Sequence, residues 1–193
     1  MKITTRELRR TDWDALEKLF GANGACGGCW CMAWRSPYAG KAYEERKGTK
    51  NRNDLRRRLR AGRVYGVLAF ADSEPVGWCS IGPRAGFPKL QRSRALRTVW
   101  DEGTWSVTCF FVRRTHRGEG IGASLLREAI AVGRRHGARA IEGYPVRSDR
   151  DKPLPGPFVW TGLPSMFEAA GFALVTTPPA RPIYELVLAT SRR

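Results

Sequence analysis

The chain has 193 residues, a length that suits one folded domain with a buried core. Hydrophobic residues make up 42% of it, and no run of about 18 or more apolar residues predicts a membrane span. Lysine and arginine outnumber acidic residues by 34 to 18, so the net charge of +16 favours anionic partners such as nucleotides, acidic metabolites or RNA.

The first half of the chain predicts a strand, two helices and a hairpin. Leu16, Leu19 and Phe20 form an apolar stripe at helical spacing. Leu55 and Leu59 give a strongly basic segment one side that can face a core. The expected elements are a strand at 2–8, helices at 12–20 and 50–62, and strands at 64–71 and 76–83.

The second half predicts a mixed α/β fold with a strand–loop–helix–strand unit at its centre. Residues 84–100 are basic and irregular, with a helical turn. The strand at 104–112 is apolar and long enough to cross the middle of a sheet. The other expected elements are helices at 120–137 and 164–170, and strands at 139–146, 172–177 and 183–188.

The run FVRRTHRGEGIGASLL, residues 111–126, carries the clearest chemical signal. It joins a buried strand to a helix N-terminus, where the first amides lack partners and the helix dipole favours a diphosphate. Glycines let the backbone approach such a ligand closely. A Rossmann dinucleotide site is the competing interpretation. The loop follows a late strand, however, without the opening βαβ unit and the acidic residue that such a site needs.

This run resembles the acyl-CoA-binding motif of the GNAT N-acetyltransferases, Arg/Gln-x-x-Gly-x-Gly/Ala, with Val112, Arg117, Gly120 and Gly122 on the motif positions. The run SMFEAAGF, residues 165–172, fills the place of a later family helix that ends in Gly-Phe. The resemblance spans nearly the whole chain. It implies one GNAT domain over residues 1–193, with an α/β (α+β) fold whose mixed central sheet has splayed central strands flanked by helices.

The resemblance also implies acetyl-CoA as co-substrate. The CoA pyrophosphate would lie on amides of residues 118–123, and the pantetheine arm would pair like an extra strand with the backbone around Phe111 and Val112. An amide near Phe111 would polarise the thioester carbonyl. The amine of a small molecule would then attack directly, without a covalent enzyme intermediate. The implied CoA-binding residues are Phe111, Val112, Arg117, Gly118, Glu119, Gly120, Ile121, Gly122 and Ala123.

The sequence departs from the family pattern at the expected catalytic positions. Phe167 stands where many members have a tyrosine that protonates the leaving thiolate, and phenylalanine cannot donate a proton. Residues 104–112 contain none of the carboxylates that many members carry on this strand. Glu119 stands where a basic or neutral residue is commoner, so it must point away from the phosphates.

The acid and the base must therefore come from other residues. Glu142 and Tyr144 lie two apart on a strand and face the same side of the sheet. We expect Glu142 to be the base, the alternative being a glutamate held by one of the many arginines. Tyr144 and Ser165 are the candidate proton donors. His116 and His136 fit less well, since one sits beside the loop entry and the other near a helix end.

The segment CGGCWC, residues 26–31, holds three of the five cysteines. Cys26, Cys29 and Cys31 would supply three ligands of a structural zinc site, but no second cluster lies nearby, and no thioredoxin-like unit supports a redox pair. We expect no metal and a reduced, cytoplasmic protein, since the start of the chain also lacks a secretory signal. We interpret one set of residues as a rigid wall of the acceptor cavity, with a local core plug as the alternative: Trp30, Cys31, Met32 and Trp34.

Two other functions stay open on the same fold. Residues 41–63 hold ten basic and three acidic residues, which would suit aminoacyl-tRNA as the acyl donor, with the RNA backbone bound electrostatically. A non-catalytic homologue that binds CoA or nucleic acid is the third hypothesis. The sequence identifies neither the acceptor amine nor the acyl chain, and it leaves open whether the chain forms a homodimer.

Overall fold

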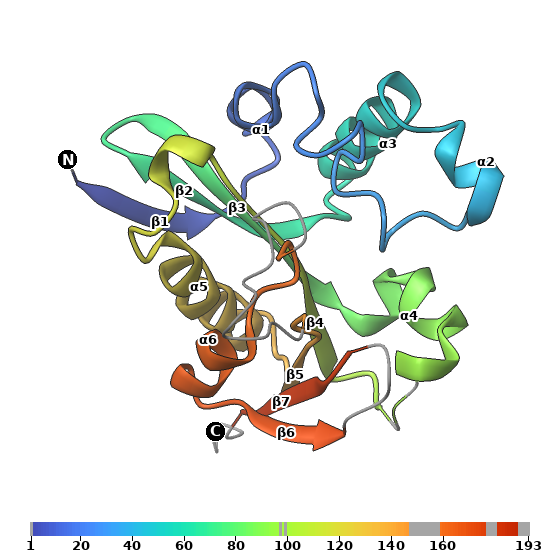
Figure 1. Ribbon diagram of the computed structural model, residues 1–193, viewed down its shortest axis with the longest axis vertical. Coiled ribbons are helices and arrows are strands. Elements are labelled where there is room, and N and C mark those ends of the chain that lie inside the picture. The colour runs from blue at the N-terminus through green and yellow to red at the C-terminus, as the bar shows by residue number, and fades with distance from the viewer. Residues whose placement is uncertain (1, 97, 99, 147–158, 177–180, 189–193) are drawn as a thin grey trace, which may run out of the picture.

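A computed structural model describes residues 2–96, 98, 100–146, 159–176 and 181–188. Its centre is a seven-stranded sheet in the order β1-β2-β3-β4-β5-β7-β6 (Figure 1). Among these strands β4 and β5 run parallel, and every other neighbouring pair is antiparallel. The strands are β1 (Ile3–Glu7), β2 (Tyr65–Ala71), β3 (Glu74–Pro83), β4 (Thr104–Val112), β5 (Ala140–Gly143), β6 (Ala173–Thr176) and β7 (Ile183–Val187).

Helices cover both faces of the sheet. In Figure 1, α1 and α3 lie on one side of β1–β3, and α5 lies on the other side with α6 beside it. The helices are α1 (Trp13–Phe20), α2 (Gly40–Glu44), α3 (Thr49–Arg60), α4 (Pro88–Arg92), α5 (Ile121–Arg135) and α6 (Pro164–Ala169). Three short 3-10 turns span Arg84–Gly86, Arg94–Leu96 and Arg114–His116. The expected mixed α/β class is confirmed.

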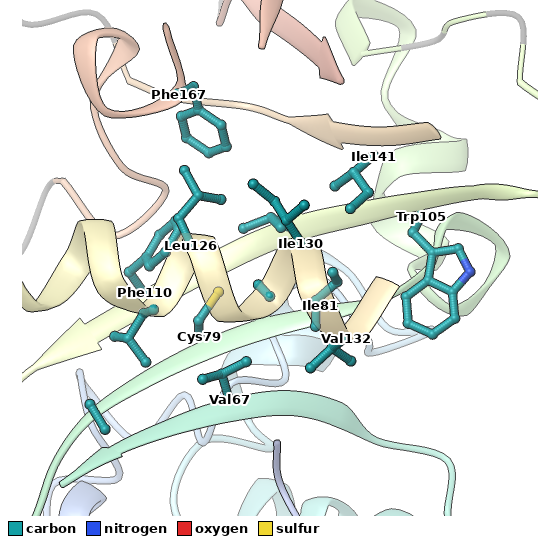
Figure 2. Close-up of a cluster of buried hydrophobic side chains, with 14 of the residues drawn as sticks. Val67, Cys79, Ile81, Trp105, Phe110, Leu126, Ile130, Val132, Ile141 and Phe167 are labelled. Atoms are coloured by element: carbon teal, nitrogen blue, oxygen red, sulfur yellow. The ribbon is translucent and has the colours of Figure 1, made fainter. Parts of the chain in front are cut away.

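The larger core lies between the sheet and α5. Leu126, Ile130 and Val132 of α5 pack against Val67, Ile81 and their neighbours (Figure 2). On the opposite face, Leu55 and Leu59 of α3 join the apolar stripe of α1 against β2 and β3. Because both faces are covered, the central strands are buried on both sides, although β4 alternates buried polar residues (Thr104, Ser106 and Thr108) with apolar ones.

β4 and β5 separate halfway along β4. Thr104–Val107 pair with Ala140–Gly143, after which β5 ends while β4 continues to Val112 beside β3. The β3–β4 register shifts between Ser80 and Ile81, where Thr108 has no partner of its own, as in a β-bulge. Beyond Val107, β4 therefore has a free edge, meaning that its backbone groups on this side are not paired with β5. On this edge the Phe110 amide donates to the Trp160 carbonyl at 2.6 Å.

Two elements differ from the sequence expectation. The strand expected at 139–146 ends at Gly143, because the chain there turns away from β4 and the Val146 amide bonds to Gly162 instead. Helix α2 was not expected, since none of its residues is buried and it shows no apolar stripe. The expected helical turn in 84–100 is present as α4 and its flanking 3-10 turns.

Candidate functional site

The glycine loop, residues 117–122, turns the chain from β4 into α5. Gly118 and Gly120 have φ angles of 86° and 73°, in the left-handed region that glycine adopts without a steric penalty. A Cβ atom at either glycine would meet nothing within 4 Å, so the space beside the loop is open. The first backbone hydrogen bond of α5 joins the Ser124 amide to the Gly120 carbonyl over 3.1 Å.

The amides of residues 118–123 donate no hydrogen bond to any described residue. Free amides at a helix N-terminus carry partial positive charge, which the helix dipole reinforces. Arg117 adds a full charge from an exposed position, with its Nε donating to the Val112 carbonyl at 3.1 Å. The loop therefore gathers donors and positive charge that match a diphosphate.

A cavity of about 620 Å³ lies beside the glycine loop. Five of the nine residues implied in CoA binding line it: Phe111, Val112, Arg117, Gly118 and Gly122. Glu119, Gly120 and Ala123 are exposed outside the lining, and Ile121 is buried in the core beneath α5. The structure thus brings the loop and the end of β4 to one cavity, while the role of each residue stays a prediction.

The cysteine segment, residues 25–34, forms the facing wall of this cavity. The segment lines it through alanine and cysteine side chains, namely Ala25, Cys26, Cys29, Cys31 and Ala33. Trp30, Met32 and Trp34 point away from the cavity into the protein, and Trp30 stacks on Trp13 with ring centroids 5.9 Å apart. Of the four residues expected in the wall, only Cys31 lines the cavity. The other three form the core plug that the sequence left as the alternative.

The backbone of the cysteine segment is unusual for residues other than glycine. Ala25, Trp30 and Cys31 all have positive φ angles, a conformation that disfavours L side chains. The start of α3 holds the segment in place, because the Gly48 amide donates to the Gly28 carbonyl at 2.8 Å. No group of three or more metal-ligating side chains with metal-site geometry occurs in the described parts of the chain.

Glu142 is buried and fully engaged by side chains of the protein. Arg84 Nε donates to its Oε2 at 2.7 Å, and both side chains are at most 2% exposed. Thr98 Oγ1 donates to Oε1 at 2.6 Å, and the Tyr144 hydroxyl donates to Oε2. Glu142 does not line the cavity. The arginine partner that the sequence left as the alternative is therefore present, and a role for Glu142 as base stays a prediction.

The candidate proton donors also lie outside the cavity lining. Burial and the charge of Glu142 raise the pKa of Tyr144 well above its usual value, and its hydroxyl already serves Glu142. Ser165 is exposed at the start of α6. Phe167 is buried in the core against Gly143, where a Cβ would come within 2.1 Å of its ring. His136 contacts Glu7 on the molecular surface.

The structure also supplies site residues that the sequence did not indicate. Tyr43 and Lys47 reach the cavity from α2 and the turn after it, and the Tyr43 hydroxyl donates to Cys29 Sγ at 3.4 Å. Cys109 lines the cavity from β4. From the sequence, Cys109 is only a buried residue of a strand. Its place on the cavity wall could not be predicted, because it follows a register shift at Thr108 that depends on the pairing with β3.

Comparison with known families matches residues 29–152 to a family described as the acetyltransferase (GNAT) family. None of the curated proteins matches the chain in sequence. Among the described residues, no helix is both long and apolar enough to cross a membrane.

Solved structures with the same fold cover nearly the whole chain. The PaiA N-acetyltransferase from Thermoplasma acidophilum, in complex with coenzyme A, has 18% identity and a TM-score of 0.56 over 97% of this chain and 100% of that one. An N-acetyltransferase from Staphylococcus aureus Mu50 has 13% identity and a TM-score of 0.55, over 97% and 99%. The ribosomal-protein-alanine N-acetyltransferase from Brucella melitensis has 16% identity and a TM-score of 0.53, over 96% and 99%.

Proposed function

Because the chain belongs to the GNAT acetyltransferase family, we propose that its cavity passes an acyl group from acyl-CoA to the amine of a small molecule. One observation carries the proposal: the free amides and Arg117 of the glycine loop adjoin the same cavity as the free edge of β4. Acyl-CoA supplies an activated thioester carbonyl. The residues of the cavity would hold the phosphates, the pantetheine arm and the acyl group of acyl-CoA in position.

The free edge of β4 suggests which amide serves the acyl donor. The Arg113 amide donates to Val76 in β3, whereas the Phe110 amide points to the opposite side and bonds to Trp160. Because amides alternate along an antiparallel strand, the Val112 amide faces the open side with that of Phe110. We therefore assign contact with the donor to the Val112 amide rather than to that of Phe111.

The walls of the cavity support a small acceptor. They come from α1, the cysteine segment, β4 and α6, and the cavity volume of about 620 Å³ lies in the range of small-molecule sites. Aromatic side chains and cysteines make up much of the lining. Among the lining residues that the structure describes, the charged ones are Lys47 and Arg117. An amine carried on a compact, mostly apolar body suits such walls.

Calorimetric titration with acetyl-CoA tests the proposal. We expect one site per chain, and Arg117→Ala should weaken binding about tenfold, because one charge-assisted contact to phosphate is lost. Arg127→Ala is the matched control. It removes the same charge from an exposed position on α5 outside the cavity lining and should bind normally. Equal losses in both variants, or no binding by the wild type, would contradict the proposal.

The same titration separates the aminoacyl-tRNA alternative. A protein that keeps nucleic acid through purification and ignores acetyl-CoA would favour that donor, with affinity that falls steeply as salt rises. A protein that binds acetyl-CoA, yet releases no CoA thiol with any amine tested, would favour the non-catalytic alternative.

A further inference from the structure

The cavity reaches both faces of the sheet. The glycine loop and Met166 line it on the side that α5 covers, where acyl-CoA is expected. On the side that α1 and α3 cover, its lining residues belong to the buried cluster of those helices or pack against it. We call this second part the acceptor compartment, and its walls are four aromatic residues and two cysteines: Phe20, Tyr43, Trp78, Phe111, Cys31 and Cys109.

The walls of the acceptor compartment present rings and sulfur to a ligand. Phe20 meets the Trp78 ring edge-on, with centroids 6.1 Å apart. The indole N–H of Trp78 donates to Cys31 Sγ at 3.1 Å, and the Tyr43 hydroxyl donates to Cys29 Sγ at 3.4 Å. Both polar hydrogens are thus already bonded to sulfur within the wall. Ring faces, ring edges and polarizable sulfur make favourable contacts with an aromatic ring, so these walls match an aromatic ligand.

The charges next to the acceptor compartment are positive. Lys47 lines the cavity, and its Nζ pairs at 2.6 Å with Glu44, whose carboxylate lies outside the lining. Behind the wall, Arg35 is 3% exposed and donates to Ser80 Oγ at 2.9 Å, two residues along β3 from Trp78. None of the ion pairs among the described residues includes Arg35. Because charges repel strongly where water is excluded, an ammonium group is unfavourable in this compartment.

The reaction itself also requires a neutral amine, because only an uncharged nitrogen has the electron pair that attacks the thioester. Among the lining residues that the structure describes, none is an aspartate, glutamate or histidine that would take a proton from an ammonium group. An alkylammonium keeps its proton up to about pH 10, as lysine does. The nitrogen lone pair of an arylamine is shared with its ring, so that amine is already neutral at pH 7.

We propose that the acceptor is an arylamine, whose amino group is attached directly to an aromatic ring and is uncharged when it enters the cavity. The inference rests on the proposed function, because it needs acyl-CoA as the donor. The ring would lie against the aromatic and sulfur walls of the acceptor compartment, with the amino group toward the end of β4.

The transfer is direct and balances without any further reactant. The amine nitrogen attacks the thioester carbonyl carbon, an N–C bond forms, and the bond from that carbon to the CoA sulfur breaks. The nitrogen gives up one proton, which passes through water to the departing CoA thiolate. The products are an N-aryl amide and CoA with a free thiol.

Two isomeric amines test the proposal, with release of the CoA thiol from acetyl-CoA as the readout. 4-Methylaniline and benzylamine have the same composition and nearly the same size, but near neutral pH only 4-methylaniline is largely uncharged. We expect kcat/KM for 4-methylaniline to exceed that for benzylamine at least about tenfold, since roughly one alkylamine in a thousand is neutral at about pH 7.5. The rate with benzylamine should rise with pH, and the rate with 4-methylaniline should not.

Methoxyamine separates the effect of the ring from that of the charge. It is neutral near pH 7 but has no ring, so its KM should be at least about tenfold higher than that of 4-methylaniline, because the burial of the ring is lost. Equal KM values for these two amines would show that the walls do not select a ring, and would overturn the inference.

The remaining outcomes separate this inference from the proposed function. Benzylamine used as well as 4-methylaniline, or 4-methylaniline that receives no acetyl group, would overturn the inference. If the same protein binds acetyl-CoA in calorimetry, the proposed function still stands. A protein that fails to bind acetyl-CoA as well would overturn both.

A pair of charge-reversal variants tests the role of the positive charge. Lys47→Glu places a carboxylate beside the acceptor compartment, so kcat/KM for benzylamine should rise about tenfold relative to 4-methylaniline, as attraction of the ammonium replaces repulsion. Lys50→Glu is the matched control, because Lys50 is exposed at the start of α3 and lies outside the lining. It should leave the ratio unchanged. An unaltered ratio in Lys47→Glu, or an equal change in both variants, would contradict the proposal.

Discussion

The Glu142–Arg84 pair shows how one contact separates a structural role from a catalytic one. The sequence predicts Glu142 and Tyr144 on one face of a strand, but β5 ends at Gly143, and the two side chains meet through the Tyr144 hydroxyl, which donates to Glu142 Oε2. It could not show that Arg84, 58 residues earlier, provides the partner. That contact depends on the 3-10 turn after β3 reaching β5, which no local pattern encodes.

We predict that Glu142→Gln lowers the free energy of unfolding by about 3–5 kcal/mol, because it leaves the Arg84 charge buried without an anion. Urea denaturation measures this change. Glu74→Gln is the control, since it breaks an exposed ion pair with Lys18 and should leave stability nearly unaltered. A Glu142→Gln protein with normal stability and no turnover would instead support the role of Glu142 as base.

The cysteine segment is a second place where the sequence predicts only part of the structure. Its composition predicted a cavity wall or a core plug, and the structure divides the segment between the two according to the direction of each side chain. Those directions follow from the positive φ angles at Trp30 and Cys31, which sequence patterns do not predict for residues other than glycine.

Among the elements, α5 connects the fold to the site. Its buried residues recur at helical spacing, so the sequence predicted the helix to within about two residues at each end. Its N-terminal glycine loop carries the predicted phosphate site, and its C-terminal end at Gly137 contributes nothing to the cavity lining. Both ends use a glycine with positive φ, which allows a matched comparison.

Gly120→Ala and Gly137→Ala should cost similar stability, about 1 kcal/mol each, because each forces an L side chain into the left-handed region without a clash. Only Gly120→Ala should also weaken acetyl-CoA binding, since it disturbs the free amides beside the cavity. Thermal unfolding and calorimetry measure the two effects. Equal affinity in both variants would argue against binding of the phosphates at the glycine loop.

The strands show which part of an element is hard to predict. The sequence predicted a strand near each of the seven strands of the described structure, yet the point where β4 and β5 separate was not visible. Residues 144–146 continue the apolar pattern, so only the three-dimensional course of the chain ends β5 at Gly143. The free edge of β4, on which the proposed donor contact depends, is a consequence of that course.

For the whole molecule, the net charge of +16 predicted an anionic partner but not its kind. Within the basic segment 41–63, Arg46 and Arg57 pair with Asp54, and Arg52 pairs with Glu17. Part of the excess charge is thereby held in contacts within the protein. The charge at the glycine loop, where the amides of residues 118–123 are free, lies beside the cavity itself.

Amide hydrogen exchange of the isotopically labelled protein, with and without CoA, tests directly whether the glycine loop binds the CoA phosphates. We expect the amides of residues 118–123, which donate to no described acceptor in the free chain, to exchange more slowly when CoA is bound. The amide of Gly137, at the far end of α5, should exchange at an unchanged rate. Saturation with CoA that leaves the amides of residues 118–123 unprotected would contradict phosphate binding at the glycine loop.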